Sequence, residues 1–315
     1  MTTRIELRGA GEEPVDLART LLSHGVADLP PNVIAQDGSA LETVLPGGGE
    51  AWAVKVVADG LDARLEAPRE APVEELAGAV RHMLRLDDDL SAFYARAAAD
   101  PELAWAADGA GRLLRSPTVF EDLVKTICTT NCTWSATERM VGALVGQLGT
   151  PARGAPERRT FPTPQAMAEA GDDFYTGVAK AGYRGAYLRA IAADVAEGGL
   201  DLEALTDPAH SDAEVAERLL ALPGVGPYAC THMMTLLGRY GRLILDSWTR
   251  PKYRRLTGRT RVTDKGIERA FRRYREYAGL AFWLTLTRDW LPEPADRSGV
   301  ETGIGLPACT ASART

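Results

Sequence analysis

The sequence contains few cysteines and no long apolar run. Its four cysteines in 315 residues, Cys128, Cys132, Cys230 and Cys309, include no Cys-x-x-Cys pair and are too few for a disulfide scaffold. No stretch of about 18 apolar residues is present to span a membrane, and the start, MTTRIELRGAGEEP, lacks the basic-then-apolar order of a secretion signal. We therefore expect reduced thiols and a cytoplasmic protein with no membrane partner, and we expect it to be a monomer.

The chain also lacks the positive net charge that favours binding to phosphates, since its formal charge is -7. The charge is unevenly distributed, however. Residues 1–80 hold fourteen acidic and six basic side chains, whereas residues 250–275 hold eleven basic side chains against Asp264 and Glu268. A basic segment of this kind indicates either a solvated helical face or a surface that contacts phosphates, and its composition alone does not distinguish the two.

The periodicity of the apolar residues changes along the chain. Residues 1–75 alternate apolar and polar side chains in RIELRGA, AWAVKVV and LDARLEA, which predicts a small α+β domain with an antiparallel sheet and a helix. From residue 76 to 291 the apolar spacing is helical, with Gly, Pro, Ser and Asp between segments. Residues 292–315 are rich in Pro, Gly, Ser and Thr and predict a flexible tail. We expect a mainly α fold.

A helical hairpin is predicted within residues 211–250. Ser211 and Glu214 have the spacing of a capping box, the first helix extends to about Ala221, and Pro227 occupies the first turn of a second helix. The connection, LPGVG, contains two glycines that leave the backbone amides open to a ligand, which indicates a site for one phosphate. An ordinary tight turn between two helices is the alternative.

The hairpin is followed about twenty residues later by Asp246, within the apolar-flanked turn LILDSWTR. This combination resembles the signature of the helix-hairpin-helix DNA glycosylase superfamily, closest to its 8-oxoguanine and 3-methyladenine branches. The segments GRLLRSPTVFEDLVKTICTTNCTW, FPTPQAMAEA and AGYRGAYLRAIAADV also resemble the family. The resemblance implies a two-lobed helical core, with residues 76–205 holding the groups that contact the orphaned base and residues 206–291 holding the hairpin and the catalytic region.

The resemblance implies that the protein acts on double-stranded DNA with a damaged base, and that Asp246 is catalytic. Breaking the C1'–N bond of deoxyribose develops positive charge on the sugar, which a fixed carboxylate stabilises. A carboxylate that only caps the next helix is the alternative. Relatives that also cut the strand have a lysine two residues after the second hairpin glycine, where this chain has Tyr228. A phenol cannot form an imine, so we expect base hydrolysis without lyase activity.

The other implied contacts fall into two groups. Asn131, Tyr183 and Arg184 match the positions that contact the orphaned base and fill the gap in the duplex. The remaining expected DNA contacts are Leu222, Gly224, Val225, Gly226 and Tyr228 in the hairpin, and Arg250 and Lys252 near the phosphates.

The expected base pocket consists of Tyr228, Trp248, Phe282 and Leu286, and His232 is interpreted as a packing residue. An apolar, indole-lined pocket favours a cationic alkylated purine through stacking and cation–π attraction. An 8-oxoguanine glycosylase and a lesion-binding protein without catalysis are the alternatives.

We expect no required cofactor. The family's four-cysteine iron-sulfur cluster is excluded, because only Cys309 follows Cys230. The resemblance implies a structural Na⁺ or K⁺ bound by the backbone carbonyls of Leu220, Leu222 and Val225.

Overall fold

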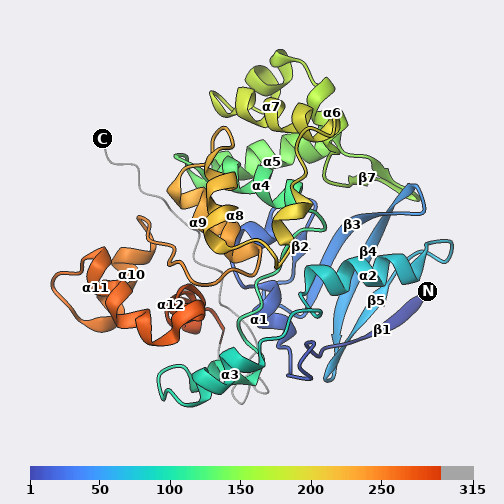
Figure 1. Cartoon of the computed structure of the whole chain (residues 1–315). Helices are drawn as coiled ribbons and strands as arrows, with labels where there is room; N and C mark the ends of the chain where they lie inside the picture. The colour runs from blue at the N-terminus through green and yellow to red at the C-terminus, as the bar shows by residue number, and fades with distance from the viewer. Residues whose placement is uncertain (292–315) are drawn as a thin grey trace.

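The computed structural model describes residues 1–291, so the predicted tail lies outside the described residues. The amino-terminal part is an antiparallel sheet in the order β1-β5-β4-β3-β2. Its strands are β1 (Thr2–Glu6), β2 (Val33–Ile34), β3 (Ala40–Gly47), β4 (Glu50–Asp59) and β5 (Asp62–Glu66). Two helices accompany the sheet, α1 (Leu17–Leu21) and α2 (Val73–Met83), and α2 lies across it in Figure 1.

The β3–β4 connection explains the three consecutive glycines of the sequence. Gly47 pairs with Glu50, and Gly48 and Gly49 have φ angles of 57° and 81°. A two-residue turn with both φ values positive matches the twist of an antiparallel pair, and glycine adopts it without steric cost.

The rest of the described chain is mainly helical. The helices are α3 (Ser91–Ala98), α4 (Val119–Thr129), α5 (Trp134–Leu148), α6 (Pro164–Glu169), α7 (Arg184–Ala196), α8 (Asp212–Leu220), α9 (Pro227–Leu236), α10 (Thr249–Thr257), α11 (Asp264–Phe271) and α12 (Ala278–Thr287). The expected fold class, mainly α with an amino-terminal α+β part, is confirmed. Among the described helices, none combines the length and apolarity needed to cross a membrane.

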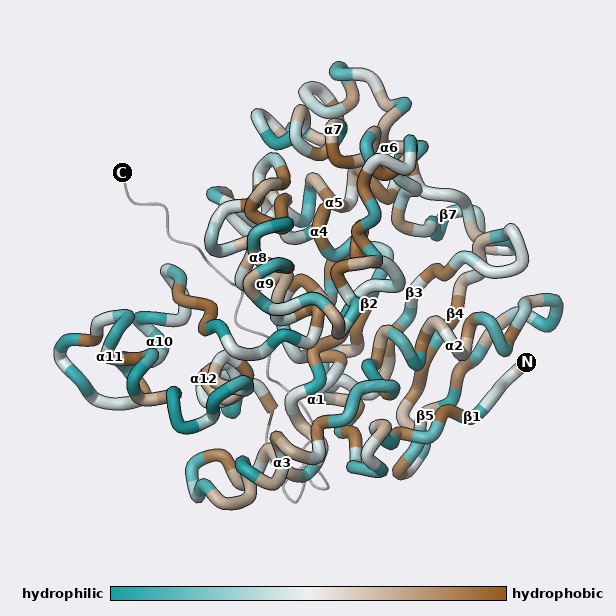
Figure 2. Tube along the Cα trace, in the orientation of Figure 1, coloured by the Kyte–Doolittle hydropathy of each residue, from teal (hydrophilic) through white to brown (hydrophobic). Residues whose placement is uncertain are grey.

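Helix α4 is the centre of the helical part. All of its residues from Val119 to Cys128 are buried, and it packs against α5, α7 and α9. One hydrophobic cluster continues from Val26 to Leu286, and a second lies under the sheet and includes Leu76 and Val80 of α2. The hydropathy colouring in Figure 2 shows apolar residues along α4 and α9, whereas the lobe of α10 and α11 is largely hydrophilic.

A short hairpin of β6 (Pro151–Ala152) and β7 (Ala155–Arg159) was not expected from the sequence. It lies beside β4, where the Arg153 amide donates to the Ala51 carbonyl and the Arg153 side chain pairs with Glu50 at 2.6 Å. Its strands carry charged residues rather than alternating apolar ones, so the hydrophobic pattern gave no signal for it.

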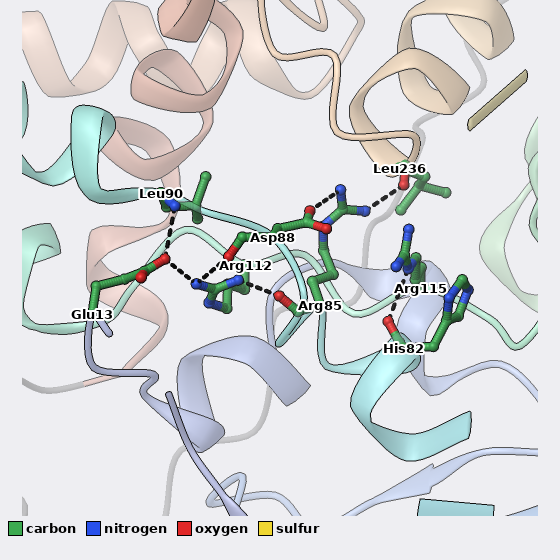
Figure 3. Close-up of polar contacts among 8 residues, drawn as sticks. All are labelled: Glu13, His82, Arg85, Asp88, Leu90, Arg112, Arg115 and Leu236. Carbon is green, nitrogen blue, oxygen red and sulfur yellow. Dashed lines mark hydrogen bonds and ion pairs between the residues drawn. The ribbon is translucent and has the colours of Figure 1, made fainter. Parts of the chain in front are cut away.

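A buried polar network joins the amino-terminal part to the hairpin helix α9 (Figure 3). Arg112, which is fully buried, pairs with Glu13 at 2.5 Å and donates to the Asp88 carbonyl at 3.0 Å. Arg85, 1% exposed, pairs with Asp88 at 2.5 Å and donates to the carbonyl of Leu236, the last residue of α9. The network therefore fixes the carboxyl end of the helix whose amino end follows the glycine turn.

Removing one member of this network should be costly, because it leaves its partner charged, buried and unpaired. We expect Arg112→Met to lower the free energy of unfolding by about 3–5 kcal/mol, measured by urea denaturation. Arg4→Met is the matched control, since Arg4 pairs with Asp62 with its side chain 70% exposed, and its loss should cost about 1 kcal/mol or less. Equal effects of the two substitutions would contradict this account of the network.

Candidate active site

A cleft of about 740 Å³ lies between the hairpin, the segment before α10 and the end of α4. Its volume is in the range of clefts that enclose a small ligand. Side chains and backbone from distant parts of the chain line it: His24, Gly25, Val26, Thr129, Thr130, Asn131, Cys132, Thr133, Trp134, Thr137, Tyr183, Gly224, Gly226, Pro227, Tyr228, Ala229, His232, Ile244, Leu245, Asp246, Ser247, Trp248 and Trp283. The glycine turn and Asp246 thus face one cleft.

The hairpin has the geometry that its sequence predicts. Ser211 and Glu214 form both bonds of a capping box, and Pro227 is in the first turn of α9. Gly224 has a φ of 81°, and a Cβ there would lie 2.8 Å from the Tyr187 ring. A glycine is therefore required at this position for both backbone and packing reasons.

The turn at the start of α9 leaves its backbone accessible. Val225 is buried, whereas Gly226 is exposed and lines the cleft. The buried Val225 side chain packs the turn against the protein. The exposed backbone at Gly226 is therefore open to an anion at the start of the ten-residue helix α9.

Asp246 binds the backbone amides at the start of α10 with one of its two carboxylate oxygens. Its Oδ1 accepts hydrogen bonds from the backbone amides of Trp248 at 2.8 Å and Thr249 at 2.7 Å. Its own amide donates to the Thr249 hydroxyl at 2.8 Å. No described residue donates a hydrogen bond to Oδ2. The binding of these amides and a function in the cleft are therefore compatible, because they use different oxygens.

Aromatic side chains line the cleft. Tyr228 and Trp248 line it as expected, and Trp283 joins them with its ring centroid 5.6 Å from that of Trp248. The Trp283 indole N–H donates to the Ser23 carbonyl at 2.8 Å, which fixes the ring.

The expectation that Phe282 and Leu286 line the base pocket is wrong for this cleft. Both are fully buried, and neither is among the residues that line it. The Phe282 ring instead packs against Phe271 and Tyr253, with centroids 5.1 and 5.8 Å away. Phe282 and Leu286 are four residues apart on one face of α12, and Trp283 is about 100° around the helix. The sequence does not identify the cleft face, because α12 is buried on almost every side.

Asn131 and Tyr183 meet at the rim of the cleft. The Asn131 side-chain amide donates to the Tyr183 hydroxyl at 3.3 Å, and both residues are exposed. Asn131 has a φ of 47°, which is uncommon for a residue other than glycine and is tolerated best by asparagine and aspartate. The two residues are placed together as the resemblance implies.

Arg184 is placed differently from the expectation. It is 7% exposed and does not line the cleft. Its guanidinium Nε donates to the Thr130 carbonyl at 3.0 Å, and its Cζ lies 4.6 Å from the Tyr183 ring centroid. It therefore supports the Asn131 turn from behind, and its donors are directed at the protein rather than at a base.

Arg250 and Lys252 also lie outside the lining of the cleft. Arg250 pairs with Asp264 at 2.8 Å and Lys252 with Asp289 at 2.5 Å. Other basic residues of this lobe are exposed: Arg254, Arg255, Arg259, Arg261, Lys265, Arg269, Arg272 and Arg275. The exposed positive charge of this lobe is thus supplied mainly by residues other than the two expected.

The residues whose carbonyls are expected to bind a cation, Leu220, Leu222 and Val225, lie at the end of α8 and in the turn after it. Leu222 is half-buried and Leu220 is 46% exposed. The Leu222 carbonyl already accepts a hydrogen bond from the Val225 amide at 3.2 Å. Neither Leu220, Leu222 nor Val225 lines the cleft, so their expected contact with DNA stays a prediction, as does the cation.

Two buried histidines were missed as cleft residues. His24 and His232 are 4% and 5% exposed, and their ring centroids are 5.7 Å apart. Burial lowers the pKa of His232 to about 4. Burial, together with the repulsion that a protonated His232 would exert, lowers the pKa of His24 to about 3. Both rings are therefore neutral at physiological pH. An isolated histidine in an apolar helix gives no sequence signal that separates a cleft residue from a packing residue.

Comparison with solved structures identifies the fold. A 3-methyladenine DNA glycosylase from Archaeoglobus fulgidus matches with a TM-score of 0.69 and 21% identity, over 90% of this chain and 97% of that one. The apo form of an 8-oxoguanine glycosylase/lyase from Clostridium acetobutylicum matches with a TM-score of 0.68 and 21% identity, over 88% and 94% of the two chains. The chain has the fold of these DNA glycosylases. No family model and no curated protein matches the sequence.

The histidine pair gives this glycosylase fold a defined acid sensitivity. The pKa of each ring in the folded protein lies below the ordinary value of 6.5. Between pH 6.5 and about 4 the unfolded chain therefore binds protons that the folded chain does not, and stability falls as the pH falls through this window.

We expect His232→Phe to weaken this acid sensitivity, because the phenyl ring keeps the packing against Tyr228 and binds no proton. When the pH falls from 7 to 4.5, the unfolding free energy of the variant should decrease by about 2–3 kcal/mol less than that of the wild type. The measurement is urea denaturation across this pH range. Parallel pH profiles for the two proteins would show that His232 is not buried in its neutral form.

Proposed function

We propose that the protein is a DNA glycosylase that everts a damaged purine from a duplex and hydrolyses its N-glycosidic bond. The observation that carries the proposal is the Asp246 carboxylate, whose Oδ2 accepts no hydrogen bond from a described residue, in the same cleft as the glycine turn of the hairpin. A carboxylate in this position can stabilise a cationic sugar, and the turn can bind the adjacent phosphate.

The fixed position of the Asp246 carboxylate supports a catalytic function. Its Oδ1 is held by two amides, so the group does not need to reorganise when positive charge develops at C1'. Ile244 and Leu245 line the cleft beside it and limit the access of water, which strengthens the interaction between the charges. The second oxygen is left to contact the sugar or to orient the attacking water.

The absence of an available amine supports hydrolysis without strand cleavage. Tyr228 lines the cleft at the position where relatives with lyase activity have a lysine, and none of the described residues that line the cleft is lysine. Lys125 is buried and pairs with Glu121 at 2.7 Å, and Lys252 pairs with Asp289. The protein therefore leaves an abasic site in this scheme.

An alkylated purine is the substrate that the cleft favours. Tyr228, Trp248 and Trp283 provide aromatic faces that attract a cationic base. The alternative, 8-oxoguanine, draws on the match of Asn131 and Arg184 to residues that contact the opposite cytosine. That argument is weaker here, because the Arg184 side chain is bound to the Thr130 carbonyl. We expect the enzyme to act as a cytoplasmic monomer without a required cofactor, although the hairpin carbonyls could bind a structural Na⁺ or K⁺.

The central test is Asp246→Asn. Asparagine retains the Oδ1 that binds the amides at the start of α10, so the fold and the affinity for DNA should be unchanged, while single-turnover base release falls at least about 100-fold. The substrates are duplexes that contain 3-methyladenine, 7-methylguanine, hypoxanthine, uracil or 8-oxoguanine, scored for free base.

The matched control is Asp264→Asn, which changes a carboxylate outside the cleft and should alter base release by no more than about twofold. If the wild type binds these duplexes and releases no base, the lesion-binding alternative is correct. Release that is confined to 8-oxoguanine would replace the alkylated purine as the substrate.

Strand cleavage is a separate prediction. We expect no covalent protein–DNA adduct when the reaction is carried out with borohydride, and no strand break until the abasic product is treated with alkali, because no amine is placed to form an imine. Tyr228→Lys supplies an amine at the hairpin and serves as a comparison. A trapped adduct with the wild-type protein would establish lyase activity.

A further inference from the structure

His24 and His232 line the cleft but have no part in the scheme above. His24 precedes a short 3-10 helix, Gly25–Asp28, in the amino-terminal part of the chain. His232 is one turn after Tyr228 on α9, and the two rings are stacked with centroids 6.2 Å apart. The two imidazoles meet nearly at right angles. The fold thus brings two buried, polar rings from distant segments together in the cleft that Tyr228, Trp248 and Trp283 also line.

The hydrogen bonding of His24 determines which of its nitrogens is free. Its Nε2 lies 2.8 Å from the Leu114 carbonyl, which can only accept, so Nε2 donates. The neutral ring then has a lone pair on Nδ1. That atom is buried and has no hydrogen-bond partner among the described residues. His24 therefore offers an acceptor that is held in place by the bond on the other side of the ring.

His232 has a similar feature. Its Nε2 is also buried and has no partner among the described residues. Both atoms are shielded from solvent in this structure, and buried polar atoms without partners are rare in folded proteins. A hydrogen-bonding group of a ligand that opens the cleft and reaches them would satisfy them. A metal is not indicated, because no group of three His, Cys, Asp or Glu side chains in residues 1–291 is arranged to hold one.

We propose that His24 and His232 together recognise a hydrogen-bonding edge of the everted base, so that the cleft selects purines that present an N–H group to Nδ1 of His24. This inference rests on the proposed function. Alkylated adenines and guanines fit it, because they keep amine or amide N–H groups on edges away from the alkyl group. Stacking on the tryptophans would then select for a flat, electron-poor ring, and the histidines would select for its edge.

The test measures binding, so that it does not depend on catalysis. Duplexes carry a 2'-fluorinated nucleotide, whose glycosidic bond resists hydrolysis, with either hypoxanthine or unsubstituted purine as the base. Hypoxanthine has an N–H next to a carbonyl, and purine has neither. We expect the wild type to bind the hypoxanthine duplex about tenfold more tightly, since a site built for hydrogen bonds rejects a base that leaves them unmade.

Three variants separate recognition from packing. His232→Phe keeps the stacking on Tyr228 and should reduce the preference to about twofold or less, as should His24→Phe. His24→Gln can donate to the Leu114 carbonyl and accept from the base with the same side-chain amide, and should retain the preference. His210→Phe, outside the cleft, is the matched control and should bind both duplexes as the wild type does.

The outcomes distinguish this inference from the proposed function. Equal wild-type affinity for the two duplexes, or variants that weaken both duplexes in parallel, would overturn the inference and leave the histidines as packing residues. Base release from unfluorinated duplexes together with equal affinities would refute the inference alone. A preserved preference without base release would refute catalysis alone, and loss of both would refute both.

Discussion

The cleft depends on a carboxylate that is held at the start of a helix by only one of its oxygens. The amides of Trp248 and Thr249 bind Oδ1 of Asp246, and this pair of bonds fixes the group without surrounding it. A side chain that is positioned in this way can carry charge in a partly enclosed cleft, because the helix start stabilises the anion. The structural role of Asp246 at the helix start and its proposed catalytic role are therefore compatible with one geometry.

The positions of Tyr228 and His232 in the cleft depend on α9, which is held at both ends. At its amino end, the turn between α8 and α9 requires glycine where Tyr187 packs against Gly224. At its carboxyl end, buried Arg85 donates to the Leu236 carbonyl and connects the helix to the network around Arg112 (Figure 3). Tyr228 and His232 lie between these two fixed points. The amino-terminal part thus contributes to the cleft directly through His24 and indirectly through the orientation of α9.

The local motifs of the site could be predicted from the sequence, but the faces of its helices could not. The capping box at Ser211 and the proline at the start of α9 depend on residues close together in the chain, and they form as expected. Trp283 was missed in favour of Phe282, because an apolar helix that is buried on nearly every side has no polar face to orient it.

Arg184 and His24 show a second limit of prediction from the sequence, which concerns contacts between distant parts of the chain. Their partners, the carbonyls of Thr130 and Leu114, are 54 and 90 residues away in the chain. Backbone carbonyls have no sequence signature, so tertiary contacts to them are invisible before the fold is known. These bonds have chemical consequences. The bond to the Thr130 carbonyl directs Arg184 at the protein rather than at a base. The bond to the Leu114 carbonyl leaves Nδ1 of His24 as an acceptor.

The charges of the cleft are compatible with the cationic leaving group of the proposed reaction. Asp246 is negative, and the two histidines are kept neutral by burial, which lowers the pKa of each. A protonated imidazole beside the base would repel a cationic purine and oppose the developing charge on the sugar. Neutral rings avoid both costs while they keep their hydrogen-bonding atoms. When a cationic base leaves, its positive charge moves to the sugar, next to Asp246. In the proposed reaction, one carboxylate together with aromatic faces and uncharged polar edges favours the movement of positive charge from the base to the sugar.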